Sequence, residues 1–509
     1  MNLTIDTTEA ISSPRLHTIS GNRQLGHAVV KALYNDLMQQ NKLSGEDDAT
    51  GLLQRSHLFL EEQLKRASAL ACDLPAAIEL LPEWMEQNSA KVGQQYRSYL
   101  AFRKAGGSRQ YFANKSHAQY FLNAVAPTKL VDGAWLYGLL QRWNDARFAT
   151  LIRIYLEELG EGLPDKNHVV LYRKLLSSHG CERWNALDDA YFVQGAIQLA
   201  LAHHAADFLP EVIGFNLGYE QLPLHLLITS YELDELGIDP YYFTLHVTVD
   251  NAATGHANKA LQSVMNAMPQ VADRRDFYRR MINGYKLNLL GIDTISAIRS
   301  FDLERELLTV LGSKAAVGAH LHSDYCRVGG RTVNDWLSAP GQLPAFLASL
   351  EQTGWIKRHQ DPQNSRFWKL IQGERAAMFG VFNAYEQQLI HDWIGGDWIT
   401  EKRAPEEGGP PRQLTFRAQQ RLRGLLDQGR NAPPQGFPVR GVMRTHIRHQ
   451  MPNDANDFNA DLRELEQRLA ASSSQEEMMT TLIELMSPET HHTAPGLMAT
   501  RIFSRLFQA

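Results

Sequence analysis

Apolar residues recur every three or four positions along most of the chain, which is the spacing of one buried helix face. Glycine and proline separate these stretches. The pattern predicts helices over residues 58–80, 134–159, 169–176, 191–208 and 212–236. Two short segments around a turn sequence at 354–371 instead predict a β-hairpin with several basic residues. We therefore expect an all-α fold with one small hairpin.

The density of this pattern divides the chain into five regions. A helical N-terminal region covers residues 1–110, and the densest helical block covers 111–300. Residues 301–395 combine helices with the hairpin, 396–442 are rich in glycine and proline, and 443–509 return to helix. The glycine- and proline-rich region predicts a linker between the helical parts.

Composition is that of a soluble globular protein. Of 509 residues, 44% are hydrophobic and 21% are charged, which are ordinary values. We find no signal-peptide pattern and no apolar run long enough for a membrane span, so we expect no membrane contact. A formal net charge of −5 argues against a nucleic-acid-binding protein. Three widely separated cysteines fit a reducing cytoplasm.

Two histidines and an aspartate interrupt an otherwise apolar segment at His246, Asp250 and His256. Such groups are costly to bury without a partner, and a transition metal is a common partner for this set. His246 and Asp250 are four residues apart and share one helix face. His256 lies about 120° away from Asp250 on an ideal helix. It joins the set only if the helix is interrupted near Gly255; otherwise it packs or caps the helix.

Three glutamates and a histidine surround a glycine-rich turn at residues 160–164. Glu158 follows apolar positions on its helix and is the favoured inward-facing carboxylate. Glu161 is the fallback, whereas Glu157 is expected to face solvent. His168 falls in the first turn of the next helix. Taken alone, the segment is better explained as a charged helix end with one histidine satisfied by hydrogen bonds.

Glu220 lies within a strongly apolar predicted helix that carries small residues at Gly214 and Gly218, which permit close approach of another helix. A glutamate there suits a bridging metal ligand, and a surface glutamate on an amphipathic helix is an equally good alternative. Helix-bundle sites for two metal ions draw carboxylates and histidines from separate helices in this way. Oxygen and imidazole donors without cysteine favour iron or manganese over zinc.

Over residues 115–290 the chain resembles the haem-oxygenase-like diiron oxidases and oxygenases, often called iron-containing redox enzymes. The resemblance rests on Glu158-Leu159-Gly160-Glu161-Gly162 with His168, on 214–220, and on 236–243 running into His246. It implies a haem-oxygenase-like helical bundle, usually dimeric, with two non-haem Fe²⁺ ions that react with O₂. By position it implies the metal ligands Glu158, His168, Glu220, His246, Asp250 and His256.

Several residues lie outside that set or depart from it. The gap between Asp250 and His256 is five residues, longer than is usual in the family. Some members use an extra carboxylate upstream, for which Asp132 is the candidate here. His491 and His492 are expected to be polar surface or cap residues. No catalytic residue is assigned beyond the ligands, and the residues expected near the substrate are Phe215, Tyr219 and Phe243.

The resemblance implies an enzyme that uses O₂ to oxidise a small amine, amino-acid-like or fatty-acid-like metabolite. N-oxygenation, desaturation and oxidative C–C cleavage all fit. An external electron donor is required, because no flavin or iron–sulfur motif is visible. The alternatives are a metal-free enzyme of the same fold, of the thiaminase or quinone-cofactor-biosynthesis type, or a non-catalytic regulatory protein that uses the basic hairpin.

Overall fold

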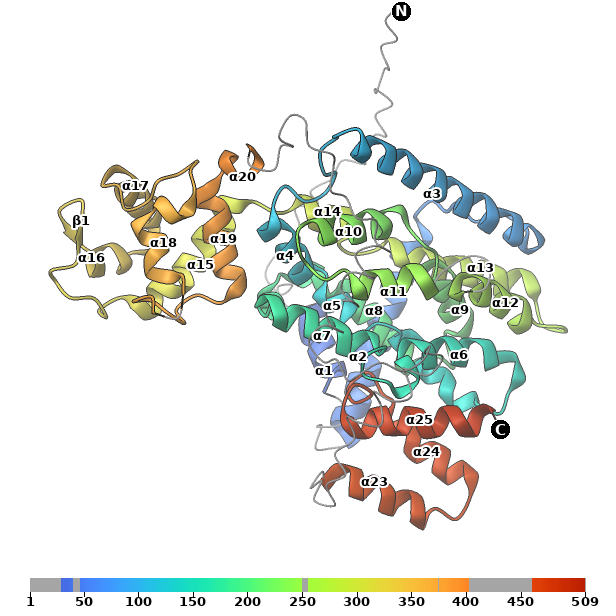
Figure 1. Ribbon diagram of the computed structural model, residues 1–509. Helices are drawn as coiled ribbons and strands as arrows, with labels where there is room; N and C mark the ends of the chain where they lie inside the picture. The colour runs from blue at the N-terminus through green and yellow to red at the C-terminus, as the bar shows by residue number, and fades with distance from the viewer. Residues whose placement is uncertain (1–28, 40–45, 250–254, 374, 402–459, 509) are drawn as a thin grey trace, which may run out of the picture.

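The computed structural model describes five segments of the chain, residues 29–39, 46–249, 255–373, 375–401 and 460–508. Over these residues the protein is helical apart from one two-stranded ribbon, which confirms the predicted all-α class. Figure 1 shows a central bundle, a lobe at its left and a group of C-terminal helices below it. None of the described helices combines the length and the apolar content that crossing a membrane needs.

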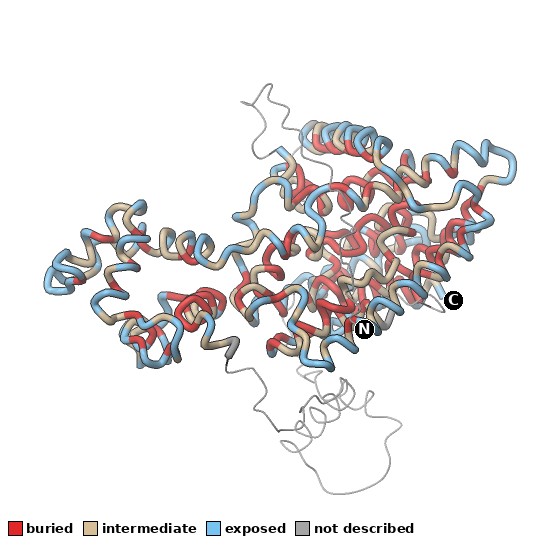
Figure 2. Tube along the Cα trace, turned by 90° about the horizontal axis from the view of Figure 1, so that it is seen from above, coloured by how far each residue is buried: buried red, intermediate tan, exposed pale blue. Residues whose placement is uncertain are grey.

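The central bundle is built from the helices before residue 300, and Figure 2 shows that buried residues concentrate there. Its N-terminal helices are α1 (Val29–Leu37), α2 (Glu46–Ser68), η2 (Ile78–Leu80), α3 (Leu81–Lys104), α4 (Lys115–Ala124) and α5 (Ala126–Lys129). The middle ones are η3 (Ala134–Arg142), η4 (Ala146–Phe148), α6 (Ala149–Glu158), η5 (Gly160–Gly162), α7 (His168–His179), η6 (Arg183–Ala186), η7 (Asp189–Phe192) and α8 (Val193–His203). The last ones are α9 (Leu209–Tyr219), α10 (Leu224–Glu235), α11 (Tyr241–Val249), α12 (His256–Ala267), α13 (Arg274–Lys286), η8 (Leu287–Leu289) and α14 (Thr294–Arg299).

Three of the predicted helices are interrupted, and the first of them, 58–80, ends with α2 at Ser68 and resumes only as η2. The segment 134–159 forms η3, η4 and α6, because the Asp145 side chain caps a new turn by accepting a hydrogen bond from the Arg147 N–H. The segment 212–236 breaks between α9 and α10, where Pro223 cannot continue a helix. Glu220 consequently lies at the C-terminal end of α9 and not within a continuous helix.

Helices α9 and α13 cross at two glycines. A Cβ on Gly214 would lie 1.8 Å from the Met281 carbonyl oxygen, and one on Gly284 would lie 2.1 Å from the Glu211 carbonyl oxygen. Side chains at these positions would therefore force the helices apart. A hydrogen bond between charged side chains also joins the two helices at this crossing, because Arg280 Nε donates to Glu211 Oε1 at 2.6 Å. The close approach predicted from the small residue at 214 is found.

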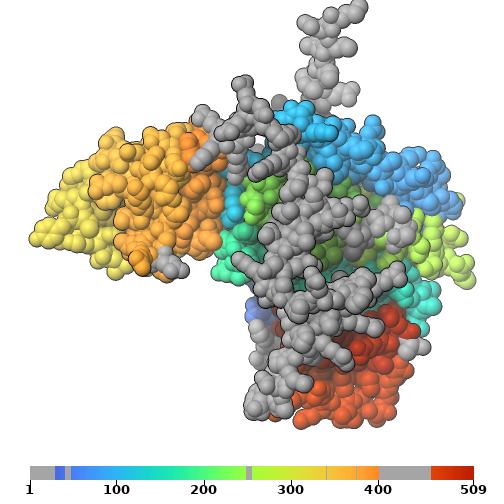
Figure 3. Space-filling view, viewed as in Figure 1, coloured from blue at the N-terminus to red at the C-terminus, as the bar shows by residue number. Residues whose placement is uncertain are grey.

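Residues 301–401 form the lobe at the left of Figures 1 and 3, with an apolar core of their own. Its elements are α15 (Leu303–Gly318), β1 (Arg327–Val328), β2 (Arg331–Thr332), α16 (Val333–Leu337), η9 (Pro340–Gln342), α17 (Leu343–Gln352), η10 (Pro362–Asn364), α18 (Arg366–Ile371), α19 (Ala384–Gly395) and α20 (Asp397–Glu401). The strands β1 and β2 pair antiparallel. The lobe joins the bundle where the Ser116 N–H at the start of α4 donates to Asp392 Oδ2 at 2.8 Å.

The β-hairpin predicted over residues 354–371 is wrong. The segment forms turns, η10 and α18, and the ribbon of this lobe lies earlier, at β1 and β2. Aromatic and apolar residues here imitate a strand, but Trp368 and Ile371 are three residues apart and both buried, which is helical spacing. At the predicted turn, Pro362 begins η10.

The C-terminal helices α23 (Ala460–Ala471), α24 (Gln475–Leu485) and α25 (Ala494–Gln508) pack below the bundle in Figure 1. Met479, Leu482 and Phe503 belong to the same apolar core as the bundle helices. The predicted linker 396–442 begins with α20 and otherwise lies outside the described residues. The division of the chain into five regions therefore stays a prediction.

Three buried histidines predict how stability responds to acid. Burial is the main cause that lowers the pKa of His203, His225 and His492 to about 4 in each case. Because the unfolded chain takes up these protons near pH 6.5, the free energy of unfolding falls as the pH drops from about 6.5 to about 4. We expect the urea midpoint, followed by circular dichroism, to decrease from pH 7 to pH 5. His203→Gln should flatten this dependence, and a midpoint independent of pH would contradict the expectation.

Candidate metal centre

The turn between α6 and α7 brings a glutamate and a histidine together. Gly160 has a φ of 61°, and a Cβ there would lie 2.4 Å from the Asn167 N atom, so the chain can fold back this tightly only at glycine. Asn167 caps α7 and donates its Nδ2 to the Leu159 carbonyl at 3.2 Å. As a result His168 Nδ1 lies 2.5 Å from Glu158 Oε2.

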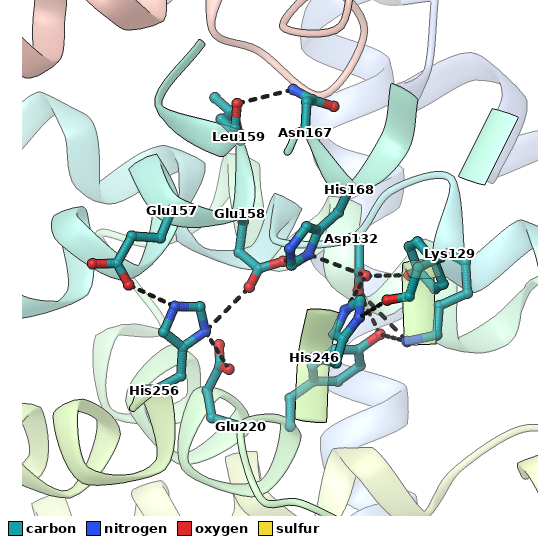
Figure 4. Close-up of polar contacts among 12 residues, drawn as sticks. Lys129, Asp132, Glu157, Glu158, Leu159, Asn167, His168, Glu220, His246 and His256 are labelled. Carbon is teal, nitrogen blue, oxygen red and sulfur yellow. Dashed lines mark hydrogen bonds and ion pairs between the residues drawn. The ribbon is translucent and has the colours of Figure 1, made fainter. Parts of the chain in front are cut away.

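Asp132 reaches the same place from the segment before η3. Gly133 has a φ of 82°, and a Cβ on it would lie 2.9 Å from Glu158 Cβ, so this segment packs directly on α6. The carboxylate of Asp132 is fully buried, with Oδ2 3.1 Å from His246 Nε2 and 3.9 Å from His168 Nδ1. One ligand atom from each of Asp132, Glu158, His168 and His246 lies within 4.8 Å of the others. We call these four residues the Asp132 group (Figure 4).

Two tyrosines and a backbone carbonyl orient this group. Tyr219 OH donates to Asp132 Oδ1 at 2.7 Å, and Tyr242 OH donates to Oδ2 at 2.5 Å. His246 Nδ1 lies 2.8 Å from the Tyr242 carbonyl, which can only accept, so Nδ1 carries the proton. In a neutral ring, Nε2 then presents a lone pair to the Asp132 carboxylate. A cation between these two atoms would stabilise the arrangement.

Glu220, His256 and Glu158 form a second set, the Glu220 group, whose ligand atoms also lie within 4.8 Å of one another. His256 Nδ1 is 3.2 Å from Glu158 Oε1 and 3.1 Å from Glu220 Oε2. His256 is the first residue of α12, and Gly255 before it is extended. His256 therefore begins a separate helix from the one that carries His246, which is the interruption near Gly255 that its joining the site needed.

Glu158 connects the two groups. Its Oε2 faces His168 in the Asp132 group and its Oε1 faces His256 in the Glu220 group, and Figure 4 shows the carboxylate between them. Burial raises the pKa of Glu158, but the neighbouring His168 and His256 outweigh this and hold the pKa well below its ordinary value. Burial also raises the pKa of Asp132, and Lys129 and His246 outweigh it in the same way. Both carboxylates are therefore negative at neutral pH.

Glu157 was predicted to face solvent, but its carboxylate instead contacts two neighbouring side chains. Its Oε2 lies 2.7 Å from His256 Nε2 and 2.5 Å from Lys259 Nζ, and its side chain is 28% exposed. Burial raises the pKa of Glu157, but the hydrogen bonds with His256 and Lys259 reverse this and lower it. Glu157 thus orients His256 through the ring nitrogen that faces away from the Glu220 group.

The structure brings together most of the residues predicted as ligands. Glu158, His168, Glu220, His246 and His256 all belong to the two groups. Asp250 lies outside the described residues. Glu161 is exposed and belongs to neither group, whereas Asp132, expected at most as an extra ligand, belongs to the first. Metal binding by these residues stays a prediction.

Two of the three residues expected near the substrate line a cavity of about 290 Å³ that reaches His246. These are Tyr219 and Phe243. Phe215 does not line the cavity, because its side chain is fully buried against the rings of Trp135 and Tyr219, at centroid distances of 5.4 and 5.7 Å. Phe215 therefore packs behind Tyr219 and does not face the cavity.

All residues of the two groups come from one stretch of chain, between Asp132 and His256. A family model described as iron-containing redox enzyme matches residues 119–288. Over these residues the match agrees with the predicted family. The match supports a redox function, and it leaves the lobe and the C-terminal helices outside the matched range. Searches of curated proteins and of solved structures give no significant match.

The C-terminal segment covers the turn between α6 and α7, which sequence reasoning missed. His491 is 2% exposed, so its prediction as a surface residue is wrong. Burial lowers its pKa well below the ordinary value, so the ring is neutral, and its Nδ1 lies 3.2 Å from Asn167 Nδ2. Arg501 Nε donates to the Gly162 carbonyl at 2.9 Å. The turn that carries Glu158 and His168 is therefore held from outside by α25 and by the connection between α24 and α25.

Replacing His491 by Ala should loosen this turn. The change removes the acceptor for one Asn167 N–H and leaves it buried, which costs about 1–3 kcal/mol. We expect a lower melting temperature and weaker retention of a metal ion by the Asp132 group. His492→Ala is the matched control, because no described contact joins His492 to Asn167. Equal effects of both substitutions on metal retention would argue against a positioning role for His491.

Proposed function

We propose that the chain is a non-haem diiron oxidase or oxygenase that uses O₂ to oxidise a small metabolite. The main support for this proposal is the buried carboxylate of Glu158, whose two oxygens face two different sets of side chains that could bind metal. A carboxylate shared in this way is the arrangement of helix-bundle sites for two iron or manganese ions. The matched family, described as iron-containing, favours iron.

Under this proposal the Asp132 group holds one iron ion and the Glu220 group holds the other, with Glu158 shared. The donors fit, because each group offers carboxylate oxygens and imidazole nitrogens and neither contains cysteine. When bound, two ferrous ions supply electrons for the reduction of O₂. Asp250 remains a proposed ligand of the second ion on the basis of the sequence.

The surrounding side chains then act as positioning residues. Tyr219 and Tyr242 fix the orientation of Asp132 through both of its oxygens. The Tyr242 carbonyl sets the ring tautomer of His246, which leaves Nε2 as the ligating atom. Lys259 balances the charge of Glu157, which in turn orients His256. Such outer contacts commonly change metal affinity or activity by about 10–100-fold when they are removed.

The reaction requires partners that the sequence only implies. We propose an external electron donor to restore the ferrous state, and a homodimer as in the resembling family. N-oxygenation, desaturation and oxidative C–C cleavage remain the proposed reaction types, since pocket shape and not the ligand set selects among them.

Anaerobic loading with ferrous iron tests the proposal. We expect both iron ions to be retained after desalting and an absorbance change on adding O₂. Asp132→Asn removes one negative charge from the Asp132 group and should reduce the iron content by about half. Asp165→Asn, at an exposed residue in the turn before α7, should leave it unchanged. Protein that retains less than one iron per chain and shows no change with O₂ would overturn the proposal.

A further inference from the structure

The cavity of about 290 Å³ beside His246 is lined by apolar residues together with the charged side chains of Lys129 and Asp293. Its walls come from α4, α5, α8, α9, α10, α11 and the start of α14. Phe121, Phe243 and Leu226 are apolar lining residues, and Lys129 lines the cavity together with Tyr219. The volume is at the lower end of the range for ligand sites.

Lys129 is the one lysine or arginine among the described residues that line this cavity. Its Nζ donates to Tyr219 OH at 3.0 Å and lies 3.8 Å from Asp132 Oδ1, which is too far for a good hydrogen bond. An ammonium group has three N–H donors, so one contact with Tyr219 does not satisfy it. The Asp132 oxygens already accept from two tyrosines. Lys129 is consequently a cation that can bond an anion in the cavity.

The remaining charged and titratable groups of the lining do not compete for that anion. Burial, followed by the charge of Lys129, lowers the pKa of His225 to about 4, so its ring is neutral at neutral pH. Asp293 is exposed, and both of its oxygens accept hydrogen bonds from Ser296 at the start of α14. The negative charge of the lining therefore lies at an exposed position, while Lys129 is largely buried.

We propose that this cavity binds a small organic acid, with its carboxylate on Lys129 and its apolar body against Phe121 and Phe243. The site lies beside His246, so the proposal names the substrate class of the proposed oxidation and rests on that function for its catalytic meaning. It favours carboxylate-bearing metabolites over simple amines. Binding itself does not depend on iron, which allows the two proposals to be tested apart.

Calorimetric titration of the iron-free protein with hexanoate, hexylamine and 1-hexanol tests the charge preference. These probes share one apolar body and differ in the charge of the head group. We expect hexanoate to bind at least tenfold more tightly than the other two. Lys129→Met should weaken the binding of hexanoate by about tenfold or more, as expected for the loss of a hydrogen bond between charged groups. Lys129→Arg should retain most of the affinity, and Lys174→Met, at an exposed position on α7, should retain all of it.

Tighter binding of hexylamine, or equal hexanoate affinity in Lys129→Met and the unchanged protein, would overturn the proposal. If Lys129→Met does not fold, Phe243→Trp provides the second variant, since the larger ring fills the cavity and should abolish hexanoate binding. Iron content is measured in parallel. Normal iron loading without hexanoate binding refutes this inference alone, whereas hexanoate binding without iron refutes only the diiron function.

Discussion

Glu158→Ala is expected to abolish iron binding at both positions, not at one. The reason is that Glu158 contributes one oxygen to each group, so its removal takes a negative ligand from both. It also leaves His168 and His256 without the carboxylate between them. Iron content after anaerobic loading and desalting should fall from two ions per chain to nearly none, and the absorbance change with O₂ should disappear.

Glu161→Ala is the matched control for this substitution. Glu161 lies three residues further along, in the same turn, and is exposed outside both groups. Its replacement should leave iron content unchanged. Retention of one iron ion by Glu158→Ala would show that the groups bind metal independently, and loss of iron in Glu161→Ala would reassign the ligand.

Gly214→Ala should have the largest effect on stability. Its new methyl group would lie 1.8 Å from the Met281 carbonyl oxygen, which is backbone and cannot move without shifting α13. Overpacking of this kind typically costs about 1–3 kcal/mol. Because α9 ends at Glu220, we also expect a displaced α9 to weaken iron binding in the Glu220 group. Thermal unfolding and iron content measure the two effects.

Gly312→Ala provides a control for which the opposite change in stability is expected. Gly312 lies within α15, and a Cβ there would meet only Leu343 Cδ1 at 3.8 Å, which is ordinary contact. Alanine is favoured over glycine in an open helix by about 1 kcal/mol, so this variant should be slightly more stable. A Gly214→Ala protein as stable as Gly312→Ala would contradict the tight crossing of α9 and α13.

The sequence predicted those parts of the site whose signal is local. Glu158, His168 and His246 stand out because each is a polar residue on an apolar helix face or at a helix start. Asp132 lacks such a signal, since it lies between helices and reaches the site through the positive φ of Gly133. His491 could not be found by any periodicity, because it contacts Asn167 across 324 positions of the chain.

The hairpin error has a related cause. A short apolar segment such as 366–371 satisfies both strand and helix patterns, and packing inside the lobe decides between them. The interruption of the helix before His256, in contrast, could be predicted from the spacing of the residues. Residues six positions apart on a regular helix do not face one point, so His256 could join the site only through a break such as the one at Gly255.

The contact between Arg501 and Gly162 spans 339 residues. At translation rates of about 5–20 residues per second, a ribosome needs roughly 20–70 s to add that length of chain. During this interval the nascent α6–α7 turn already displays its carboxylate and imidazole groups but lacks the helices that cover it. Stable metal capture should therefore follow synthesis of α25, so that truncated translation products remain unmetallated.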